Sequence, residues 1–167
     1  MNINTENKFV YFVMSTIQHY NKEKYWKRRA EVINSNSKVP KIIRMLYLLY
    51  IKRCDAYNCA SMGTDFGKGA VFLTPPNLPH HLNGIIIGHN AVIGKNCTIF
   101  QQVTIEQGNS RQGTIIGDNC LLGKGCFIKG GIKIGNNVKV GANAVVTHDV
   151  PDNCTVAGVP AVIIKKE

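Results

Sequence analysis

Large aliphatic residues recur at every sixth position through the back two-thirds of the chain. A first run in this register comprises Ile87, Ile93, Ile99 and Ile105. A period of six matches neither an α-helix nor the two-residue alternation of a strand. It is typical of a coil in which a short strand and a corner alternate, and three such units close one triangular turn. The pattern predicts a β-helix whose aliphatic side chains point into a prism, and a second run continues it: Ile116, Leu122, Ile128, Ile134, Val140 and Val146.

A second set of inward positions lies four residues after the first. Its members are small or medium-sized, as a crowded interior requires. Gly after most aliphatic residues, and Gly or Asn two residues later, tolerate the positive φ that tight corners demand. A Gly-rich β-sandwich is the alternative, but it does not explain two runs in a strict period of six. The predicted second set is Ala91, Cys97, Val103, Cys120, Cys126, Ile132, Val138 and Ala144.

The repeat is interrupted twice, and each interruption predicts a loop that leaves the coil. Where the second run begins, the chain is five residues longer than one repeat, which places a loop within 108–113. Between Phe72 and Ile87 it is three residues longer than two repeats, which places another loop within 74–83. Phe66 shares the phase of Phe72, so we expect the coil to begin there.

The front of the chain has helical spacing. Residues 6–33 and 40–57 carry apolar side chains three and four positions apart, which predicts two helices. Between them, 34–40 is rich in Asn and Ser and ends in a proline that favours the start of a helix. We therefore divide the chain into a basic helical segment, 1–58, and a β-helix domain, 59–167. The segment is expected to pack on the end of the β-helix or on a neighbouring subunit.

Positive charge is concentrated in this helical segment. The net charge of the chain is +10, and residues 1–58 hold 11 Lys and Arg against 4 Asp and Glu. Such an excess favours an anionic partner. No nucleic-acid-binding motif is present and the aromatic residues have the spacing of a helix core, so we expect no nucleic acid. An anionic membrane surface is the candidate partner we keep for 1–58.

The absence of export and membrane signals favours the cytoplasm. No apolar run reaches the roughly 18–20 residues of a membrane helix, and the first residues lack the basic start and cleavage site of a signal peptide. The six cysteines form no Cys-x-x-Cys pair, which argues against a zinc or redox motif and favours reduced thiols. We expect a cytoplasmic protein, peripheral at the inner face of the membrane if residues 1–58 bind lipid.

Adjacent histidines in the first predicted loop are the best candidates for chemistry. His80 and His81 lie just before the coil resumes, and a neutral imidazole beside a rigid wall suits general-base catalysis. Two histidines that cap a turn are the plain alternative. With His89 they make three nearby histidines, so a zinc site of the kind in trimeric β-helix carbonic anhydrases is a remote alternative. No ligand spacing supports it, and we expect no metal.

Two stretches of the coil resemble a known family. Residues 78–105, LPHHLNGIIIGHNAVIGKNCTIFQQVTI, resemble the catalytic coils of serine acetyltransferases and of O-acetyltransferases in capsule and exopolysaccharide synthesis. The tail at 157–161, AGVPA, is similar to the closing motif of these hexapeptide-repeat acyltransferases. The resemblance covers about residues 60–167. It implies a left-handed β-helix, a homotrimer with active sites between subunits, and transfer of an acetyl group from acetyl-CoA to a hydroxyl.

The same resemblance implies roles for individual residues. The family pattern His-x-x-Gly-Ile-x-Ile-Gly falls on 81–88, so His81 inherits the role of general base, with His80 as the alternative. The family orients this imidazole with an Asp whose matching position falls near Cys59, and Asp65 is the substitute we expect by proximity. No metal is required, because a thioester is already activated. The matching donor-binding positions are Lys124, Ala142, Val159 and Pro160, with Lys165 placed to meet the phosphates of CoA.

The acceptor-facing positions depart from the serine acetyltransferase pattern. The Asp before the catalytic His is His80 here, the Gly-Gly after the Val-Thr stretch is Glu106-Gln107, and the Arg-His pair keeps only Arg111. Asn83, Gln107 and Arg111 remain the candidates for contact with a small-molecule or saccharide acceptor. The departures favour a saccharide hydroxyl, and Arg111 keeps free serine open as the alternative.

Overall fold

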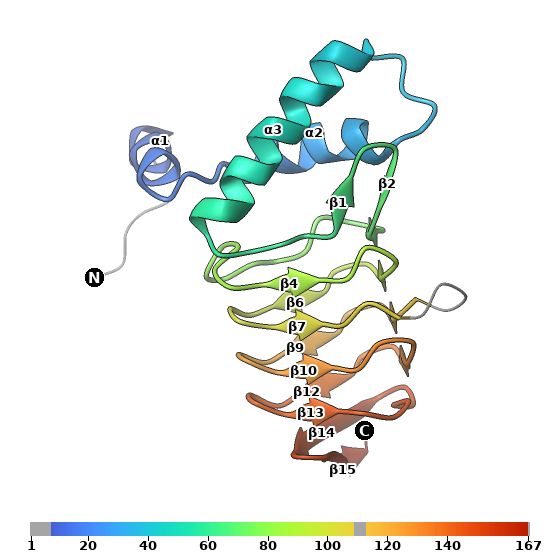
Figure 1. Ribbon diagram of the computed structural model, residues 1–167. Coiled ribbons are helices and arrows are strands. Elements are labelled where there is room, and N and C mark those ends of the chain that lie inside the picture. Colours follow the sequence, from blue (N-terminus) through green and yellow to red (C-terminus); the bar gives the residue numbers. More distant parts are fainter. Residues whose placement is uncertain (1–7, 109–112, 167) are drawn as a thin grey trace.

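Helices lie at one end of a stack of β-coils, and the last strand closes the other end (Figure 1). This computed structural model describes residues 8–108 and 113–166. The helices are α1 (Lys8–Ile17), α2 (Lys22–Ile33) and α3 (Lys41–Tyr57).

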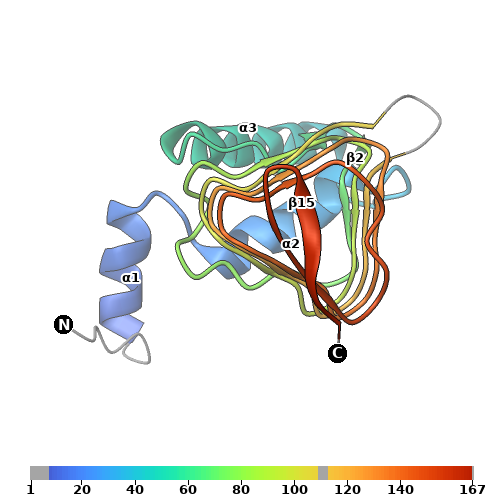
Figure 2. The ribbon, with the colours of Figure 1, turned by 90° about the horizontal axis from the view of Figure 1, so that it is seen from below.

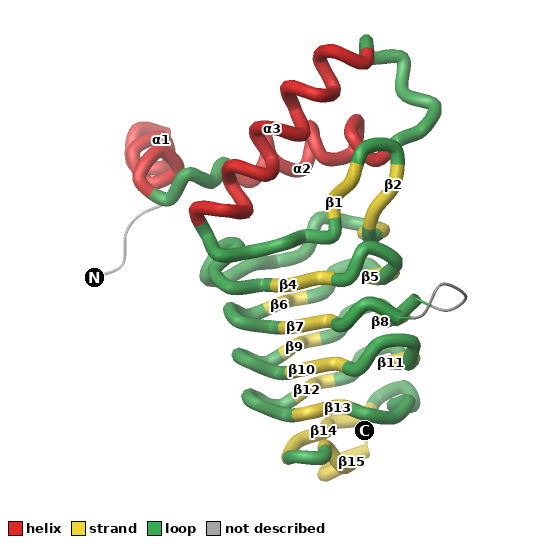
Figure 3. Tube along the Cα trace, viewed as in Figure 1, coloured by secondary structure: helices red, strands yellow, loops and turns green. Residues whose placement is uncertain are grey.

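The coil strands form three sheets, one for each face of a triangular prism (Figures 2 and 3). The strands of these three sheets pair in parallel, except that the closing strand β15 runs antiparallel to β14. Sheet 1 contains β4 (Ile86–Ile87), β7 (Thr104–Ile105), β10 (Phe127–Ile128) and β13 (Val145–Val146). Sheet 2 contains β3 (Val71–Phe72), β5 (Val92–Ile93), β8 (Ile115–Ile116) and β11 (Lys133–Ile134). Sheet 3 contains β6 (Thr98–Ile99), β9 (Leu121–Leu122), β12 (Lys139–Val140), β14 (Cys154–Gly158) and β15 (Ala161–Lys166).

The predicted inward positions form the core of the prism. The strand register stacks Ile87 on Ile105, Ile105 on Ile128 and Ile128 on Val146 down sheet 1. Every aliphatic residue of the two runs is buried, and so is every member of the smaller set four residues later. Each coil thus covers the apolar layer of the next, and this burial supplies the main favourable energy of such a repeat.

The corners of the coil form three edges, named by the sheets that they join in chain order. Along the 2–3 edge, Asn96, Asn119, Asn137 and Asn153 all have φ between 55° and 59°. Their side-chain amides form a ladder from coil to coil, with N···O distances of 3.3, 3.2 and 2.8 Å. Asn suits this place because it tolerates the left-handed conformation better than other residues with a side chain.

The coil does not begin at Phe66 as expected. That residue sits in the turn of a small antiparallel hairpin, β1 (Thr64–Asp65) with β2 (Lys68–Gly69). The reason is that Gly67 and Gly69 adopt φ of 76° and 146°, which turns the chain back on itself. The first pairing between coils is the bridge between Ser61 and Ile86. The predicted boundary between a helical segment, 1–58, and a β-helix domain, 59–167, stays a prediction.

The first predicted helix, 6–33, is two helices. The chain breaks at Gln18–Asn21, where His19 has a φ of 51°. Asn21 then caps α2, because its side-chain oxygen accepts a hydrogen bond from the Lys24 N–H at 3.0 Å. The break between α2 and α3 falls where the sequence predicts it.

The helical segment packs on the end of its own β-helix through buried polar contacts. The guanidinium of Arg29 donates to the carbonyls of Met62 and Ala70 and to the Thr64 hydroxyl, at 3.0, 2.6 and 2.9 Å. Burial lowers the pKa of Arg29 to about 10, so the group stays charged at neutral pH.

Among the described residues, no helix is long and apolar enough to cross a lipid bilayer.

Candidate active site

His81 lies in the turn that leads into β4 and faces the helical segment. Its backbone has a φ of 55°, and its N–H donates to the Leu78 carbonyl at 3.0 Å. The ring meets the Tyr20 ring edge-on, with centroids 5.6 Å apart and an interplanar angle of 64°. Tyr20 is itself held in place, because its hydroxyl accepts a hydrogen bond from the Trp26 indole N–H at 3.0 Å. The helical segment therefore forms one wall of the histidine's surroundings.

The two adjacent histidines have different environments. His81 is half-buried, whereas His80 is exposed and its ring lies 6.2 Å from that of Phe100. Burial lowers the pKa of His81, and the nearby charge of His80 lowers it further. Because the lowered pKa keeps the imidazole neutral at physiological pH, His81 is suited to accept a proton.

The expectation that Asp65 orients His81 is not met. Its carboxylate lies 3.4 Å from Nε2 of His89 instead, because the β1–β2 hairpin carries Asp65 toward a different corner of the coil. Cys59, at the matching family position, is exposed with a φ of 50°. Within the described part of the chain, no carboxylate is hydrogen-bonded to either ring nitrogen of His81.

Asn58 ties the histidine turn to both parts of the molecule. Its carbonyl accepts a hydrogen bond at 2.8 Å from the N–H of Gly84, a residue of the same turn as His81. Its side-chain amide donates to the Gln18 carbonyl at 3.3 Å and to the Cys54 carbonyl at 2.9 Å. The turn that carries His81 is thereby fixed to the α1–α2 link and to the end of α3. Neither Tyr20 nor Asn58 has a sequence signal for this role, because both act through contacts far apart in the chain.

The 3–1 edge runs down from the histidine turn and gathers most of the predicted donor-binding positions. Backbone hydrogen bonds join Gln102 to Asn83 at 2.9 Å, Gly125 to Gln101 at 3.0 Å and Asn143 to Lys124 at 2.8 Å. Asn83, Lys124 and Ala142 therefore lie in one column of corners, about 4.8 Å apart per coil, with the corner of Gln101 and Gln102 between Asn83 and Lys124. The turns that make up this column precede β4, β10 and β13 (Figure 1).

The C-terminal positions continue this column. The Gly141 N–H donates to the Val156 carbonyl at 2.8 Å, so the end of β14 lies beneath the corner that carries Ala142. Val159 and Pro160 form the exposed turn between β14 and β15, and Lys165 is exposed on β15. The edge thus offers a continuous exposed strip from the histidine turn to the last strand.

Gln107 lies elsewhere. It follows β7 on the 1–2 edge, and its backbone packs closely between Gly88 of one coil and Gly130 of another. A Cβ atom on Gly88 would lie 2.5 Å from the Gln107 Cα, and a Cβ atom on Gly130 would lie 2.4 Å from the Gln107 carbonyl oxygen. In a single chain Gln107 is therefore not brought together with His81. Arg111 lies outside the described residues. Glu106, beside Gln107, has a structural role, since its carboxylate accepts the Gly130 N–H at 2.9 Å.

The three histidines of the zinc alternative are not brought together as ligands. His80 faces Phe100, His81 faces Tyr20, and His89 pairs with Asp65. Over residues 8–108 and 113–166, no group of three or more His, Cys, Asp or Glu side chains is arranged to hold a metal ion.

Comparison with known proteins agrees with this architecture. The family described as "Hexapeptide repeat of succinyl-transferase" matches residues 84–108 and 113–148. Serine acetyltransferase of Staphylococcus epidermidis is 44% identical over 90 residues, which cover 52% of this chain and 42% of that protein. The serine acetyltransferase of Synechococcus elongatus is 41% identical over 88 residues, 50% of this chain and 36% of that protein. The chain thus spans less than half the length of these relatives.

Solved structures show the same likeness. The serine acetyltransferase of Neisseria gonorrhoeae superposes with a TM-score of 0.62 at 30% identity, covering 73% of this chain and 46% of that one. A serine acetyltransferase in complex with CoA superposes with a TM-score of 0.65 at 25% identity, covering 87% and 57%. The fold expected from the sequence, a left-handed parallel β-helix after a short helical segment, is confirmed.

The six-residue repeat and the triangular prism of three parallel sheets, together with the turn that carries His81, define a hexapeptide-repeat β-helix protein. The chain matches the hexapeptide-repeat family over residues 84–108 and 113–148, and the relatives and solved structures named above that it resembles are serine acetyltransferases.

Proposed function

We propose that the protein is an O-acetyltransferase that moves an acetyl group from acetyl-CoA to a hydroxyl, with His81 as general base. The observation that carries this proposal is the position of His81. Its half-buried ring stands at the head of the 3–1 edge, where the turn is fixed from both sides, and burial lowers its pKa. The relatives named above are acetyltransferases, which supports the same reaction.

His81 would act twice in one direct transfer. Its imidazole removes the proton of the acceptor hydroxyl while that oxygen attacks the thioester carbon. Backbone N–H groups of the coil wall or of a loop would donate hydrogen bonds to the oxyanion that forms. When the C–S bond breaks, His81 returns the proton to the departing thiolate. General-base help of this kind contributes about 10²–10⁴-fold to a rate.

The exposed strip of the 3–1 edge is the proposed donor groove. Lys124, Ala142, Val159 and Pro160 lie along it below His81, at successive coils. Lys165 lies farther away, paired with Thr155 toward the 2–3 edge, so its contact with the phosphates of CoA stays a prediction from the resemblance. A solved serine acetyltransferase of the same fold is a complex with CoA, which supports CoA as the donor here.

A homotrimer with active sites between its subunits would explain how Gln107 reaches the site of His81. Within one chain it lies on the 1–2 edge, away from His81 on the 3–1 edge. A neighbouring prism that turns its 1–2 edge toward this 3–1 edge would bring Gln107 to the histidine, and the role of Arg111 stays a prediction from the sequence. Asn83, beside His81 in the chain, would face the same acceptor.

Serine is the acceptor that the comparisons favour, and not the saccharide that the sequence departures favoured. The relatives and solved neighbours named above are serine acetyltransferases, and one further neighbour is a soybean enzyme complexed with serine. The departure at Glu106 also counts less against serine. Its carboxylate accepts a hydrogen bond from the Gly130 N–H, so this residue has a structural role. The saccharide stays as second candidate on one observation: exposed His80 stands where the family pattern has Asp.

The remaining expectations about location stay predictions. No comparison supports an anionic membrane surface as partner of residues 1–58, and that surface is not part of the proposal. The cytoplasm stays the predicted compartment.

The proposal is tested by thiol release from acetyl-CoA with purified protein. The acceptors are L-serine, simple sugars and nucleotide sugars, each assayed with and without protein. Release that depends on L-serine supports the serine proposal, and release with a sugar alone supports the second candidate. A chain that releases no thiol with any acceptor contradicts the proposed function.

A further inference from the structure

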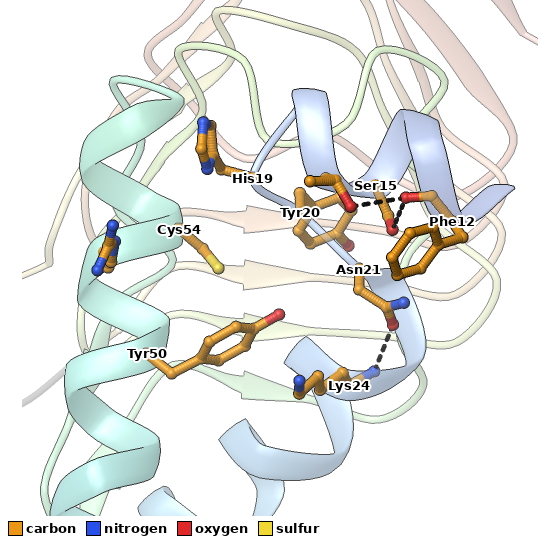
Figure 4. Close-up of a pocket in the computed structure, with 10 residues that line it drawn as sticks. Phe12, Ser15, His19, Tyr20, Asn21, Lys24, Tyr50 and Cys54 are labelled. Atoms are coloured by element: carbon orange, nitrogen blue, oxygen red, sulfur yellow. Dashed lines mark hydrogen bonds between the residues drawn. The ribbon is translucent and has the colours of Figure 1, made fainter. Parts of the chain in front are cut away.

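His81 has few polar neighbours within its own subunit. Its ring meets the Tyr20 ring at 5.6 Å, and no carboxylate of the described chain is hydrogen-bonded to either ring nitrogen. The pocket between the helices does not supply such a neighbour: Figure 4 shows Tyr20, Asn21 and Tyr50 in its lining, and His81 is not part of that lining. Apart from Asn83, the groups that would hold an acceptor beside His81 therefore have to come from a neighbouring subunit.

Another histidine forms a pair with a carboxylate on the 1–2 edge. Nε2 of His89 lies 3.4 Å from the Asp65 carboxylate, and both side chains are 40% exposed. Within the described part of the chain, the other ring nitrogen of His89, Nδ1, has no hydrogen-bond partner. A neutral imidazole that directs its Nε2–H to a carboxylate keeps Nδ1 as an acceptor. The pair thus offers a ring nitrogen and carboxylate oxygens to an N–H or O–H donor from outside the subunit.

The pair is fixed by the hairpin and by the coil. His89 occupies the corner directly after β4, and Asp65 lies in β1, above that corner (Figure 1). The hydroxyl of Thr64, next to Asp65, accepts a hydrogen bond from the buried Arg29 guanidinium at 2.9 Å, which ties the hairpin to α2. An exposed ion pair contributes little to stability. The pair is therefore a preformed feature of the surface whose contribution to folding is small.

The two histidines lie at opposite ends of β4. His81 belongs to the turn that leads into β4 at the 3–1 edge, and His89 to the corner that follows β4 at the 1–2 edge. Along the prism they are separated by less than one coil spacing of about 4.8 Å. Closed cyclic symmetry relates subunits by rotation, without translation along the axis. A homotrimer of parallel prisms, in which each 3–1 edge faces a neighbouring 1–2 edge, therefore brings the neighbour's His89 level with His81.

We propose that the His89–Asp65 pair of the neighbouring subunit completes the site of His81 and positions the acceptor there through a hydrogen-bond donor of that molecule. The inference rests on the proposed function and adds the residues that hold its acceptor. The donor is an N–H or O–H group near the reacting hydroxyl, either the ammonium of L-serine or a second hydroxyl of a saccharide. The pair also returns a carboxylate to a site in which His80 replaces the Asp of the family pattern.

Steady-state kinetics test the pair as an acceptor-binding element. His89→Ala and Asp65→Asn should each raise the KM of the acceptor about tenfold and leave the KM of acetyl-CoA unchanged, because the pair contacts only the acceptor. An effect with L-serine assigns the ammonium, and an effect with a saccharide assigns a hydroxyl. An acceptor KM that stays unchanged in both variants overturns the inference.

His148→Ala is the matched control for these variants. His148 lies on the same 1–2 edge, three coils below, where its Nδ1 is 2.9 Å from the Thr147 hydroxyl. It is far from the corner that carries His89, so its replacement should change neither KM. A rise of the acceptor KM in His148→Ala equal to that in His89→Ala would show that the effect is not specific to the pair, and would overturn the inference.

Mixed trimers test whether the pair acts across the subunit boundary. Subunits with His81→Ala and subunits with His89→Ala are co-expressed under different affinity tags, and the trimers that carry both tags are purified. In every such trimer one of the three sites combines an intact His81 with an intact His89 of the neighbouring subunit, so kcat/KM for the acceptor should reach about a third of the wild-type value. Mixed trimers no more active than the His89→Ala homotrimer overturn the inference.

Chemical cross-linking tests the same geometry without any activity. In a Cys59→Ser background, which removes the exposed thiol, Asn83→Cys and His89→Cys are combined and treated with a short bismaleimide. The double variant should form covalent trimers on a denaturing gel. Asn83→Cys combined with Asn96→Cys, which lies on the 2–3 edge, should stay monomeric.

The cross-link separates this inference from the proposed function. A double variant with cysteines at 83 and 89 that stays monomeric, while the wild type releases thiol, overturns the inference and leaves the proposed function intact. Absence of thiol release by the wild type contradicts the proposed function, and the cross-link then still decides whether His89 faces the site of His81.

Discussion

The β-helix and the helical segment are stabilised in different ways. In the β-helix one pattern repeats: an aliphatic residue points inward, a smaller one follows, and the corner takes Asn or Gly. In the helical segment the decisive contacts occur once each. Tyr25 donates to the buried Asp55 carboxylate at 2.6 Å, and Arg44 donates to the carbonyls of Glu31, Val32 and Asn34. The regular part builds a rigid wall, and the irregular part completes the surroundings of His81.

Exposed apolar side chains are arranged differently in the two regions. In the coil they stand next to buried ones along a strand, as Leu121 does beside Leu122, whereas α3 exposes Ile42, Met45, Leu46 and Leu49 on one helix face. Substitutions in the two regions should therefore differ in kind and in size. The following experiments test this contrast, beginning with the largest expected effect.

Two neighbouring leucines of β9 test the core of the prism. Leu122 is fully buried and Leu121 is 37% exposed. Leu122→Ala should lower the free energy of unfolding by about 2–5 kcal/mol, because it leaves a cavity between coils. Leu121→Ala should lower it by about 0.5 kcal/mol or less. Urea denaturation followed by circular dichroism measures both, and equal losses would contradict the inward assignment.

Arg29 tests the attachment of the helical segment. Arg29→Met leaves two carbonyls and the Thr64 hydroxyl without their donor and should cost about 3 kcal/mol. Because these contacts join α2 to the first coil, Trp26 fluorescence should change at lower denaturant than the circular dichroism of the β-helix. Arg28→Met is the control, since Arg28 lies against the Tyr47 and Tyr50 rings instead. Coincident transitions in Arg29→Met would show that the two regions unfold as one.

Asn119 tests the corner rule. Its φ is 57°, and its amide joins the ladder to Asn96 and Asn137. Asn119→Ala should lower the free energy of unfolding by about 1–2 kcal/mol, because a Cβ without a compensating side-chain hydrogen bond is disfavoured there. Asn119→Gly should cost less, since Gly accepts this φ freely. Thermal denaturation compares the two variants, and a greater loss with Gly would refute the backbone explanation.

The pH dependence of activity tests how the two regions act on His81. Its pKa lies below the usual 6.5, mainly through burial and then through His80. The acidic limb of kcat/KM should therefore lie below pH 6.5 in the wild type. Tyr20→Ala exposes the ring and His80→Gln removes a neighbouring charge, so both should move the limb to higher pH. The shift should be greater for Tyr20→Ala, because burial is the larger cause, and a shift to lower pH in either variant would contradict this.

The sequence predicts the β-helix well because each coil is determined by local choices that repeat. The six-residue period identified both buried sets and the Asn corners, whereas most of the loop predicted within 108–113 lies outside the described residues. It failed at Phe66, where glycines close a hairpin, and at the break before Asn21, where a cap interrupts a continuous apolar pattern. The site was predicted only in part. The choice of His81 and of the donor-binding positions comes from the family resemblance and stays a prediction. Tyr20 meets His81 through tertiary packing across the chain, which no local pattern encodes.

Acetyl transfer by single-histidine variants tests the central claim most directly. We expect His81→Ala to lower kcat for thiol release from acetyl-CoA by about 10²–10⁴-fold, while His80→Ala stays within about threefold of the wild type. Both variants should keep the circular dichroism spectrum and melting temperature of the wild type. Full activity in His81→Ala, or an equal loss in His80→Ala, would contradict His81 as the base.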